Sequence, residues 1–332
     1  MRLGLALPHY DTSYAGEPVS WARVREVARL AERAGYDSIW VSDHLFLDFA
    51  KYGGPADSQD AFECWTTMSA LAASTERVRI GSLVVCNDLR NPGLLAKMIA
   101  TVDRLSGGRV DVGLGAGWYE PEYRAAGIAF DEPAVRIARM GEALQIVSRL
   151  LEGEELTFEG KHYRLSGAIC RPGPHQSPRP PLWVGGKGDM TLRTAARHAD
   201  GWNFSWVTSL DAYEERARAA DAACEKVGRD PASLRRSAGV YVLAGRDEAD
   251  ARARFERLAE VSPPGVLGPG VSWEDFRRDR VAGGKQEVID KLGSLAALGV
   301  ESVVVGLGVV PFQVSDLEDV AFVGTEIAPE LR

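Results

Sequence analysis

Short apolar runs alternate with longer amphipathic segments from one end of the chain to the other. Eight of these runs have the length and composition of β-strands: Leu3–Leu7, Ser38–Val41, Val78–Val85, Val110–Leu114, Leu182–Val184, Gly201–Phe204, Gly239–Leu243 and Ser302–Gly306. Eight is also the number of strands that a closed β/α barrel needs.

The segments between these runs repeat apolar residues near the helical period, which predicts helices over Trp21–Ala34, Leu94–Leu105, Ala134–Leu151, Leu192–His198, Leu210–Val227, Asp247–Glu260 and Lys285–Leu298. Gly35 and Gly299 follow two of them as expected helix ends. Apolar strands separated by helices indicate a parallel sheet covered on both faces, as a barrel or as an open doubly wound sheet. Because the strand count favours the barrel, we expect an α/β protein with a (β/α)8 TIM barrel.

The alternation is broken after about residue 152. Leu156–Leu165 has two β-rich arms around Glu159-Gly160 and predicts a small hairpin. Arg171–Pro181 carries five prolines, at 172, 174, 178, 180 and 181, which suits an extended loop. We therefore expect one domain over 1–332 with an insertion at about 153–181. The Pro- and Gly-rich Val261–Val271 is either a mobile lid or a plain connector.

Composition and charge narrow the class of protein. With 45% hydrophobic and 26% charged residues among 332, the chain has an ordinary globular composition rather than a disordered or fibrous one. The net charge of −8 disfavours general binding to nucleic acid or to anionic membranes. No apolar run approaches the length of a bilayer span, so we expect a cytoplasmic protein. The four cysteines have no metal-ligand spacing and are expected to be reduced thiols, and no metal site is predicted.

Candidate chemistry lies just after the strands, since reactive groups of α/β barrels gather at the carboxyl ends of their strands. The second strand ends in Ser42-Asp43-His44, an imidazole able to move protons beside a carboxylate able to hold charge. An equally weighted alternative is a capped loop in which both side chains only satisfy backbone groups. Asn87 and Asp88 follow the third strand, where by themselves they are turn residues.

Two glycine-rich turns follow the fourth and fifth strands. Gly113–Trp118 fails the dinucleotide fingerprint GxGxxG because Trp118 stands at the third glycine position. It is either a backbone that approaches a flat ligand, with Trp118 as a wall, or a plain barrel turn with a packed tryptophan. Gly185–Met190 leads into a helix, and its glycines and Lys187 suit a phosphate, although a flexible turn with a solvated lysine has the same sequence.

Taken together, the chain resembles the luciferase-like monooxygenase superfamily, whose members use reduced FMN or the deazaflavin coenzyme F420 in a TIM-type barrel. The resemblance covers nearly the whole chain and rests on the order and spacing of Leu3–Pro8, Gly35–His44, Ile80–Val85 with Asn91-Pro92, Leu105–Val110, Gly113–Trp118, Trp183–Gly186 and Ala199–Asn203.

The resemblance implies positions for a coenzyme. Asp43 and His44 match the pair that lies against the reactive face of the ring in deazaflavin enzymes, and Ser82-Leu83 matches the place where the family often has a non-proline cis peptide. The expected coenzyme contacts are Asp43, Ser82, Leu83, Asn87, Gly115, Ala116, Gly117, Trp118, Gly185, Gly186, Lys187 and Gly188. Some deazaflavin dehydrogenases carry a catalytic glutamate directly after the glycine-rich turn. This chain has Trp118 there, and nearby Glu120 and Glu122 are either substitutes or surface charges.

We therefore expect an oxidoreductase of the F420-dependent branch that transfers hydride to or from a small organic substrate. His44 is the predicted proton donor or acceptor, with Asp43 orienting it or contacting the coenzyme. Trp65, Trp118 and Trp206 are candidate substrate walls or core residues. The first alternative is an FMN-dependent monooxygenase that uses reduced flavin and oxygen, and the second is a non-catalytic flavin-binding protein. The resemblance also implies a homodimer.

Overall fold

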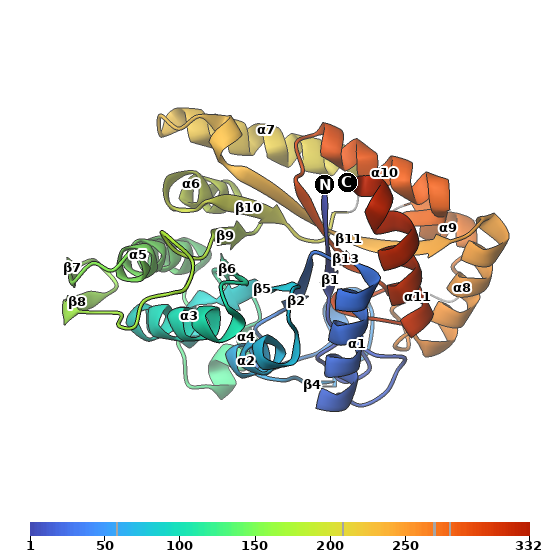
Figure 1. The fold of residues 1–332 in the computed structure, drawn as a ribbon, viewed down its shortest axis with the longest axis horizontal. Coiled ribbons are helices and arrows are strands. Elements are labelled where there is room, and N and C mark those ends of the chain that lie inside the picture. Colours follow the sequence, from blue (N-terminus) through green and yellow to red (C-terminus); the bar gives the residue numbers. More distant parts are fainter. Residues whose placement is uncertain (58, 208, 268–269, 279) are drawn as a thin grey trace.

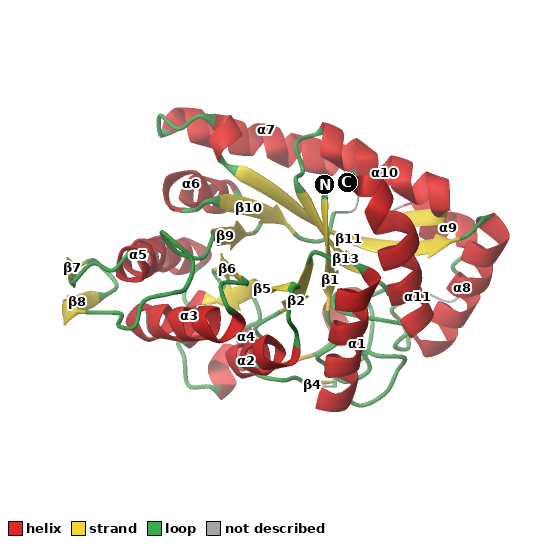
Figure 2. Cartoon of the chain, in the orientation of Figure 1, coloured by secondary structure: helices red, strands yellow, loops and turns green. Residues whose placement is uncertain are grey.

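The computed structural model describes residues 1–57, 59–207, 209–267, 270–278 and 280–332. Its sheet contains the parallel strands β1 (Arg2–Ala6), β2 (Ser38–Val41), β5 (Arg79–Cys86), β6 (Val110–Gly115), β9 (Leu182–Gly185), β10 (Gly201–Phe204), β11 (Arg235–Gly245), β12 (Val281–Gly284) and β13 (Ser302–Gly306). Pairing of β10 with β11 and of β1 with β13 closes the ring. Since β12 pairs only with the second half of β11, eight strands form the barrel and the predicted fold is confirmed (Figures 1 and 2).

Helices surround the barrel: α1 (Trp21–Ala34), α2 (Cys64–Ser74), α3 (Pro92–Ser106), α4 (Glu120–Ala125), α5 (Pro133–Leu151), α6 (Asp189–His198), α7 (Leu210–Lys226), α8 (Glu248–Val261), α9 (Trp273–Arg278), α10 (Lys285–Ala297) and α11 (Leu317–Phe322) (Figure 2). The seven predicted helices are present, with α1 as predicted and the others shifted by a few residues at their ends. Gly35 and Gly299 take positive φ angles of 98° and 84° after α1 and α10, as a helix-ending glycine does.

Sequence periodicity missed α2 for a physical reason. Six of its eleven residues are buried, and apolar or small residues occupy most of its sides, so no single apolar stripe stands out. The helices α4 and α9 have six residues each, too few to show a period.

Tryptophans and glycines paired on neighbouring strands fill the barrel interior. Trp40 is buried with Ala6, Leu83 and Val304, and a Cβ on Gly81 would overlap its indole ring. Trp183 takes up the space beside Gly201 in the same way. The interior is therefore a packed floor, and any cavity must lie above it at one end of the strands.

A hairpin extends from the barrel before β9. The strands β7 (Leu156–Glu159) and β8 (Arg164–Ala168) form the predicted antiparallel hairpin, and no helix or strand follows them before β9 (Figure 1). The predicted strand Gly239–Leu243 covers only the middle of β11, whose first residues, Arg235–Ala238, pair with β10. Part of the Val261–Val271 loop, residues 268–269, lies outside the described residues. In the described part of the chain, no helix has the length and apolarity needed to cross a bilayer.

Candidate active site

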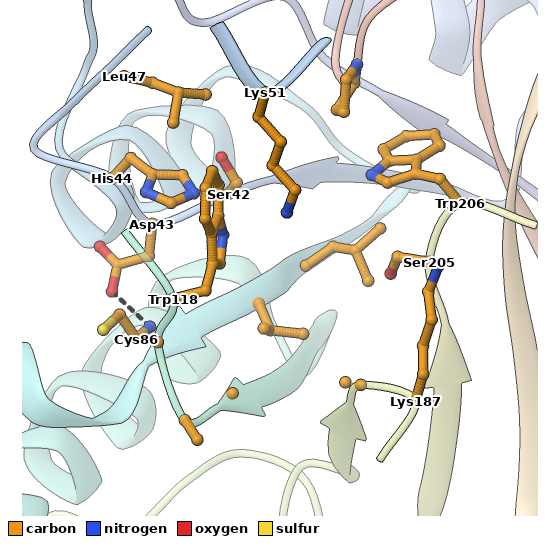
Figure 3. Close-up of a pocket in the computed structure, with 18 of the residues that line it drawn as sticks. Ser42, Asp43, His44, Leu47, Lys51, Cys86, Trp118, Lys187, Ser205 and Trp206 are labelled. Carbon is orange, nitrogen blue, oxygen red and sulfur yellow. Dashed lines mark hydrogen bonds between the residues drawn. The ribbon is translucent and has the colours of Figure 1, made fainter. Parts of the chain in front are cut away.

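A cavity of about 390 Å³ opens where the carboxyl ends of the barrel strands meet their loops (Figure 3). It is lined by segments that follow six strands: Tyr10; Ser42, Asp43, His44, Leu47, Lys51 and Tyr52; Leu83, Val84 and Cys86; Gly115, Ala116, Gly117, Trp118 and Glu122, with Pro133, Arg136 and Ile137; Gly185, Gly186, Lys187 and Thr191; Ser205 and Trp206. Pro311 and Phe312, after β13, complete the lining. Most of the predicted site residues thus meet in one place.

One ring nitrogen of His44 is hydrogen-bonded to a carboxylate, and the other is free of such a contact among the described residues. Its Nδ1 lies 3.0 and 3.2 Å from the two carboxylate oxygens of Glu122, a side chain that is fully buried. The Leu45 N–H also donates to Glu122, at 3.0 Å. Because an ionised carboxylate only accepts hydrogen bonds, Nδ1 carries the hydrogen, and Nε2 is the atom free to exchange a proton. Nε2 has no hydrogen-bond partner within the described ranges.

Asp43 has a different surrounding from the one we predicted for a residue that orients His44. Arg90 donates to both of its carboxylate oxygens, at 2.5 and 3.0 Å, and the Cys86 N–H donates at 3.0 Å (Figure 3). Burial raises the pKa of the Asp43 carboxyl group, and Arg90 opposes that shift. The orienting position beside His44 belongs to Glu122, whereas a contact between Asp43 and a coenzyme stays a prediction.

The sequence interpretation missed His9, a second histidine directly behind the lining. Its Nε2 accepts a hydrogen bond from the Ser42 N–H at 3.1 Å, so its Nδ1 donates to Leu7 O at 2.8 Å. Burial lowers the pKa of His9 to about 4, because no carboxylate compensates a charge in this place. His9 is therefore neutral and supports the Ser42 backbone. In the sequence, only its position two residues after the predicted first strand Leu3–Leu7 marks it.

The glycines of the first predicted ligand-binding turn surround a protein side chain. Added Cβ atoms on Gly113, Gly115 and Gly185 would approach the Val84 side chain to 2.8, 2.5 and 2.7 Å. Val84 follows a non-proline cis peptide between Leu83 and Val84, one bond later than the predicted Ser82-Leu83. Ser82 does not reach the cavity, because its hydroxyl bonds to Gly113 N and O at 3.0 and 3.1 Å. These glycines thus make room for Val84, which itself forms part of the cavity wall.

Among the described residues, the second glycine-rich turn leaves backbone donors free beside the cavity. Gly186 has a φ angle of 140°, which favours glycine, and Gly188 precedes α6 without a side-chain cap, so the first N–H groups of this helix have no side-chain acceptor. The Lys187 ammonium lies 4.7 Å from the centre of the Phe204 ring. Gly185, Gly186 and Lys187 line the cavity, and Gly188 lies just behind them.

The three candidate tryptophans, Trp65, Trp118 and Trp206, differ in whether they line the cavity. Trp118 and Trp206 line the cavity, and Trp118 meets the His44 ring edge-on at 5.5 Å between centroids. Trp65 lies in the core on α2, 2% exposed, and is not a substrate wall. Asn87 is also outside the lining, since its amide donates to Asp88 and to the Tyr163 hydroxyl.

Four further lining residues had no motif to reveal them. Tyr10 and Lys51 come from loops, and Glu122 and Arg136 from the helices α4 and α5. The Arg136 guanidinium donates to Gly117 O and, at 2.8 Å, to Asp131 O, so it holds the first glycine-rich turn in place.

Glu120, the other candidate glutamate, is a surface residue paired with Arg124. The four cysteines are free and buried, and within the described residues no group of His, Cys, Asp and Glu side chains is arranged to hold a metal ion.

Comparisons with known proteins show the family and agree with the fold. The family model for luciferase-like monooxygenases matches residues 1–291. An F420-dependent secondary alcohol dehydrogenase has the same fold, with a TM-score of 0.77 over 100% of this chain and 99% of that one at 22% identity.

Sequence relatives include both coenzyme types. An FMNH2-dependent dimethylsulfone monooxygenase of Pseudomonas putida is 26% identical over 93% of this chain and 87% of its own length. An F420-dependent glucose-6-phosphate dehydrogenase of Kineococcus radiotolerans is 31% identical over 71% of this chain and 68% of its own. The chain therefore belongs to the luciferase-like monooxygenase family of oxidoreductases, in which its relatives depend on F420 or on FMN.

Proposed function

We propose that this protein is an F420-dependent oxidoreductase in which His44 exchanges a proton with a small organic substrate. One observation carries the proposal. The imidazole is anchored at Nδ1 by the buried Glu122, and Nε2 is left open on a residue that lines the cavity. A proton donor or acceptor held in one orientation at a cavity wall is what general acid-base catalysis requires.

The cavity suits a planar coenzyme with a phosphate. Leu83, Val84 and Ala116 form an apolar surface against which a planar ring can pack. The Gly186–Gly188 turn offers backbone N–H groups and the Lys187 ammonium to a phosphate. When bound, a reduced deazaflavin supplies a hydride and its oxidised form accepts one.

The protein's own part is the proton. In the reductive direction, a substrate carbonyl carbon gains the hydride, its oxygen gains the proton from His44, and the imidazolium becomes neutral imidazole. In the oxidative direction, Nε2 accepts the alcohol proton. Because the Glu122 carboxylate faces Nδ1, the positive charge of the imidazolium has a counterion in both directions.

An FMN-dependent monooxygenase is the second candidate. The relative that covers the larger share of this chain depends on FMNH2, and the same turn suits the phosphate of FMN. The F420 proposal rests on the Asp43-His44 pair and on the relatives that share 31% identity with this chain.

Titration of the purified protein with each coenzyme separates the candidates. We expect submillimolar binding of F420, seen as a change in its absorbance, and hydride transfer in a screen of alcohols and ketones. Tight binding of FMN alone, with oxygen consumption, would refute the F420 proposal. Binding without any turnover would favour a non-catalytic flavin-binding protein.

The predicted homodimer is tested by light scattering of the same preparation. The cytoplasmic location stays a prediction.

A further inference from the structure

Two lysines stand at the mouth of the cavity without a carboxylate partner. Neither Lys51 nor Lys187 takes part in an ion pair within the part of the chain that the structure describes. The lining carboxylates are already engaged, Asp43 by Arg90 and Glu122 by His44. Although the whole chain carries a net charge of −8, the free charges of this cavity are therefore positive and favour anionic ligands.

Lys51 is an exposed residue in a loop whose neighbouring residues are hydrogen-bonded. It lies in the 3-10 turn Ala50–Tyr52, where Asp48 accepts the Ala50 N–H at 2.9 Å and the Tyr119 hydroxyl at 2.5 Å. The ammonium lies 3.8 Å from the centre of the Trp118 ring, and Figure 3 shows it reaching between Trp118 and Trp206. Burial and, second, Lys187 lower the pKa of Lys51, so the ammonium lacks a counter-charge.

The space beside Lys51 has aromatic walls. Trp118 and Trp206 line it, and Trp206 is stacked on Tyr241 at 4.9 Å and braced edge-on by Phe312 at 5.7 Å. Flat walls with fixed orientation favour a flat ligand, since offset stacking adds to the area buried.

Tyr10 supplies a second, independent indication of a ligand. The residue lines the cavity and is 2% exposed, but its hydroxyl has no hydrogen-bond partner among the residues described. A buried hydroxyl without a partner is unfavourable, and a ligand oxygen would relieve that cost.

We propose that the substrate of this site is a planar, conjugated carboxylate, with its carboxylate on Lys51, its flat body between Trp118 and Trp206, and an oxygen within reach of Tyr10. Lys187, beside α6, is left for the coenzyme phosphate. This inference rests on the proposed function in that the substrate shares the cavity with a coenzyme, but it does not depend on whether that coenzyme is F420 or FMN.

Calorimetric binding of model compounds to the full chain tests the charge and the shape. The probes are trans-cinnamate, the neutral trans-cinnamamide and the non-planar cyclohexanecarboxylate. We expect cinnamate to bind at least about tenfold more tightly than its amide, since a hydrogen bond to a charged group is worth about that factor or more. Cyclohexanecarboxylate keeps the charge but cannot stack flat against the indole rings, so it should also bind more weakly than cinnamate. Equal affinity for cinnamate and its amide, or no binding of cinnamate at millimolar concentration, would overturn the proposal. Equal affinity for the cyclohexane compound would overturn the planar part.

Matched lysine variants show whether each lysine binds the carboxylate of the substrate or the phosphate of the coenzyme. Lys51→Met is expected to weaken cinnamate binding roughly 10- to 100-fold and coenzyme binding less than about threefold, and Lys187→Met to do the reverse. Lys226→Met, on the exposed end of α7, is the control for a lost surface charge. If Lys51→Met weakens the coenzyme as much as Lys187→Met does and leaves cinnamate unchanged, Lys51 serves the coenzyme phosphate and the proposal is wrong. Because coenzyme affinities are measured separately, a failure of the F420 assignment is seen independently of this result.

Discussion

Two histidines follow neighbouring strands of this barrel and have opposite surroundings. His9, after β1, is completely buried, and both of its ring nitrogens are bound within the protein, to Leu7 and Ser42. His44, after β2, keeps one nitrogen on Glu122, and its other nitrogen has no partner in the described part of the chain. A histidine with both nitrogens committed stabilises a loop, whereas one with a single free nitrogen can exchange a proton.

The two buried carboxylates that line the cavity differ in the same way. Asp43 binds Arg90 and the Cys86 backbone N–H, so its charge stabilises the packing of strands and loops. Glu122 faces an imidazole that changes its charge when it gains or loses a proton. The residue pair Asp43-His44, adjacent in sequence, is thus split between a structural network and a reactive one.

The largest effect is expected from His44→Gln. The loss of the proton-exchanging nitrogen should lower kcat about 10²- to 10⁴-fold, because general acid-base catalysis contributes about that factor. Coenzyme affinity and urea unfolding should change little, since Nε2 has no partner among the described residues. Steady-state kinetics and coenzyme titration measure the two quantities. Equal losses in turnover and coenzyme affinity would assign His44 to binding.

Breaking the structural network should instead affect stability. Arg90→Met leaves Asp43 buried without a counterion, and we expect the free energy of unfolding to fall by about 3–5 kcal/mol. Urea unfolding measures the change. The double variant Arg90→Met with Asp43→Asn removes both charges and should recover part of the loss. A loss below about 1 kcal/mol in the single variant would contradict the structural role of the pair.

The fold was predictable because each strand and most helices carry their own local pattern. The eight runs from Leu3–Leu7 to Ser302–Gly306 are mostly apolar, as parallel strands covered on both faces tend to be. The site was predictable only where strand ends or glycine-rich turns mark it, as at His44 and Lys187. Glu122 meets His44 across 78 positions of sequence, and this pairing depends on how α4 packs, which no local pattern contains.

The same limit applies where the residue type alone does not show what lies beside it. The glycines of Gly113–Trp118 predict a close approach of a ligand, and Gly115 and Gly117 do line the cavity, while the Val84 side chain takes up the space beside Gly113 and Gly115. Trp65 has the residue type of a substrate wall, but it lies on the inner side of α2. Residue type shows which chemistry is possible, and the packing decides whether the side chain reaches the cavity.

Lowering the pH should reveal the contribution of His9 to the free energy of unfolding. Its pKa is about 4 in the folded protein and about 6.5 in an unfolded chain, so the unfolded chain takes up this proton first. Its contribution to stability is therefore present above about pH 6.5 and is lost as the pH falls toward 4, by on the order of 3 kcal/mol. Urea unfolding of the native chain and of His9→Gln between pH 7 and 4 measures the difference. Parallel curves for the two chains would contradict a neutral buried His9.

The smallest expected effect, that of Glu122→Gln, is the most specific test of the comparison. The amide keeps an acceptor for Nδ1 but has no charge to balance the imidazolium, so we expect kcat to fall roughly 10- to 100-fold with little change in coenzyme affinity. If Glu122 acts only through His44, the same substitution in a His44→Gln background should cost almost nothing further, because groups that act as one unit do not add. A full second loss in that double variant would mean that Glu122 contacts the reacting groups itself, and Glu122 would then be a catalytic residue in its own right rather than a residue that positions His44.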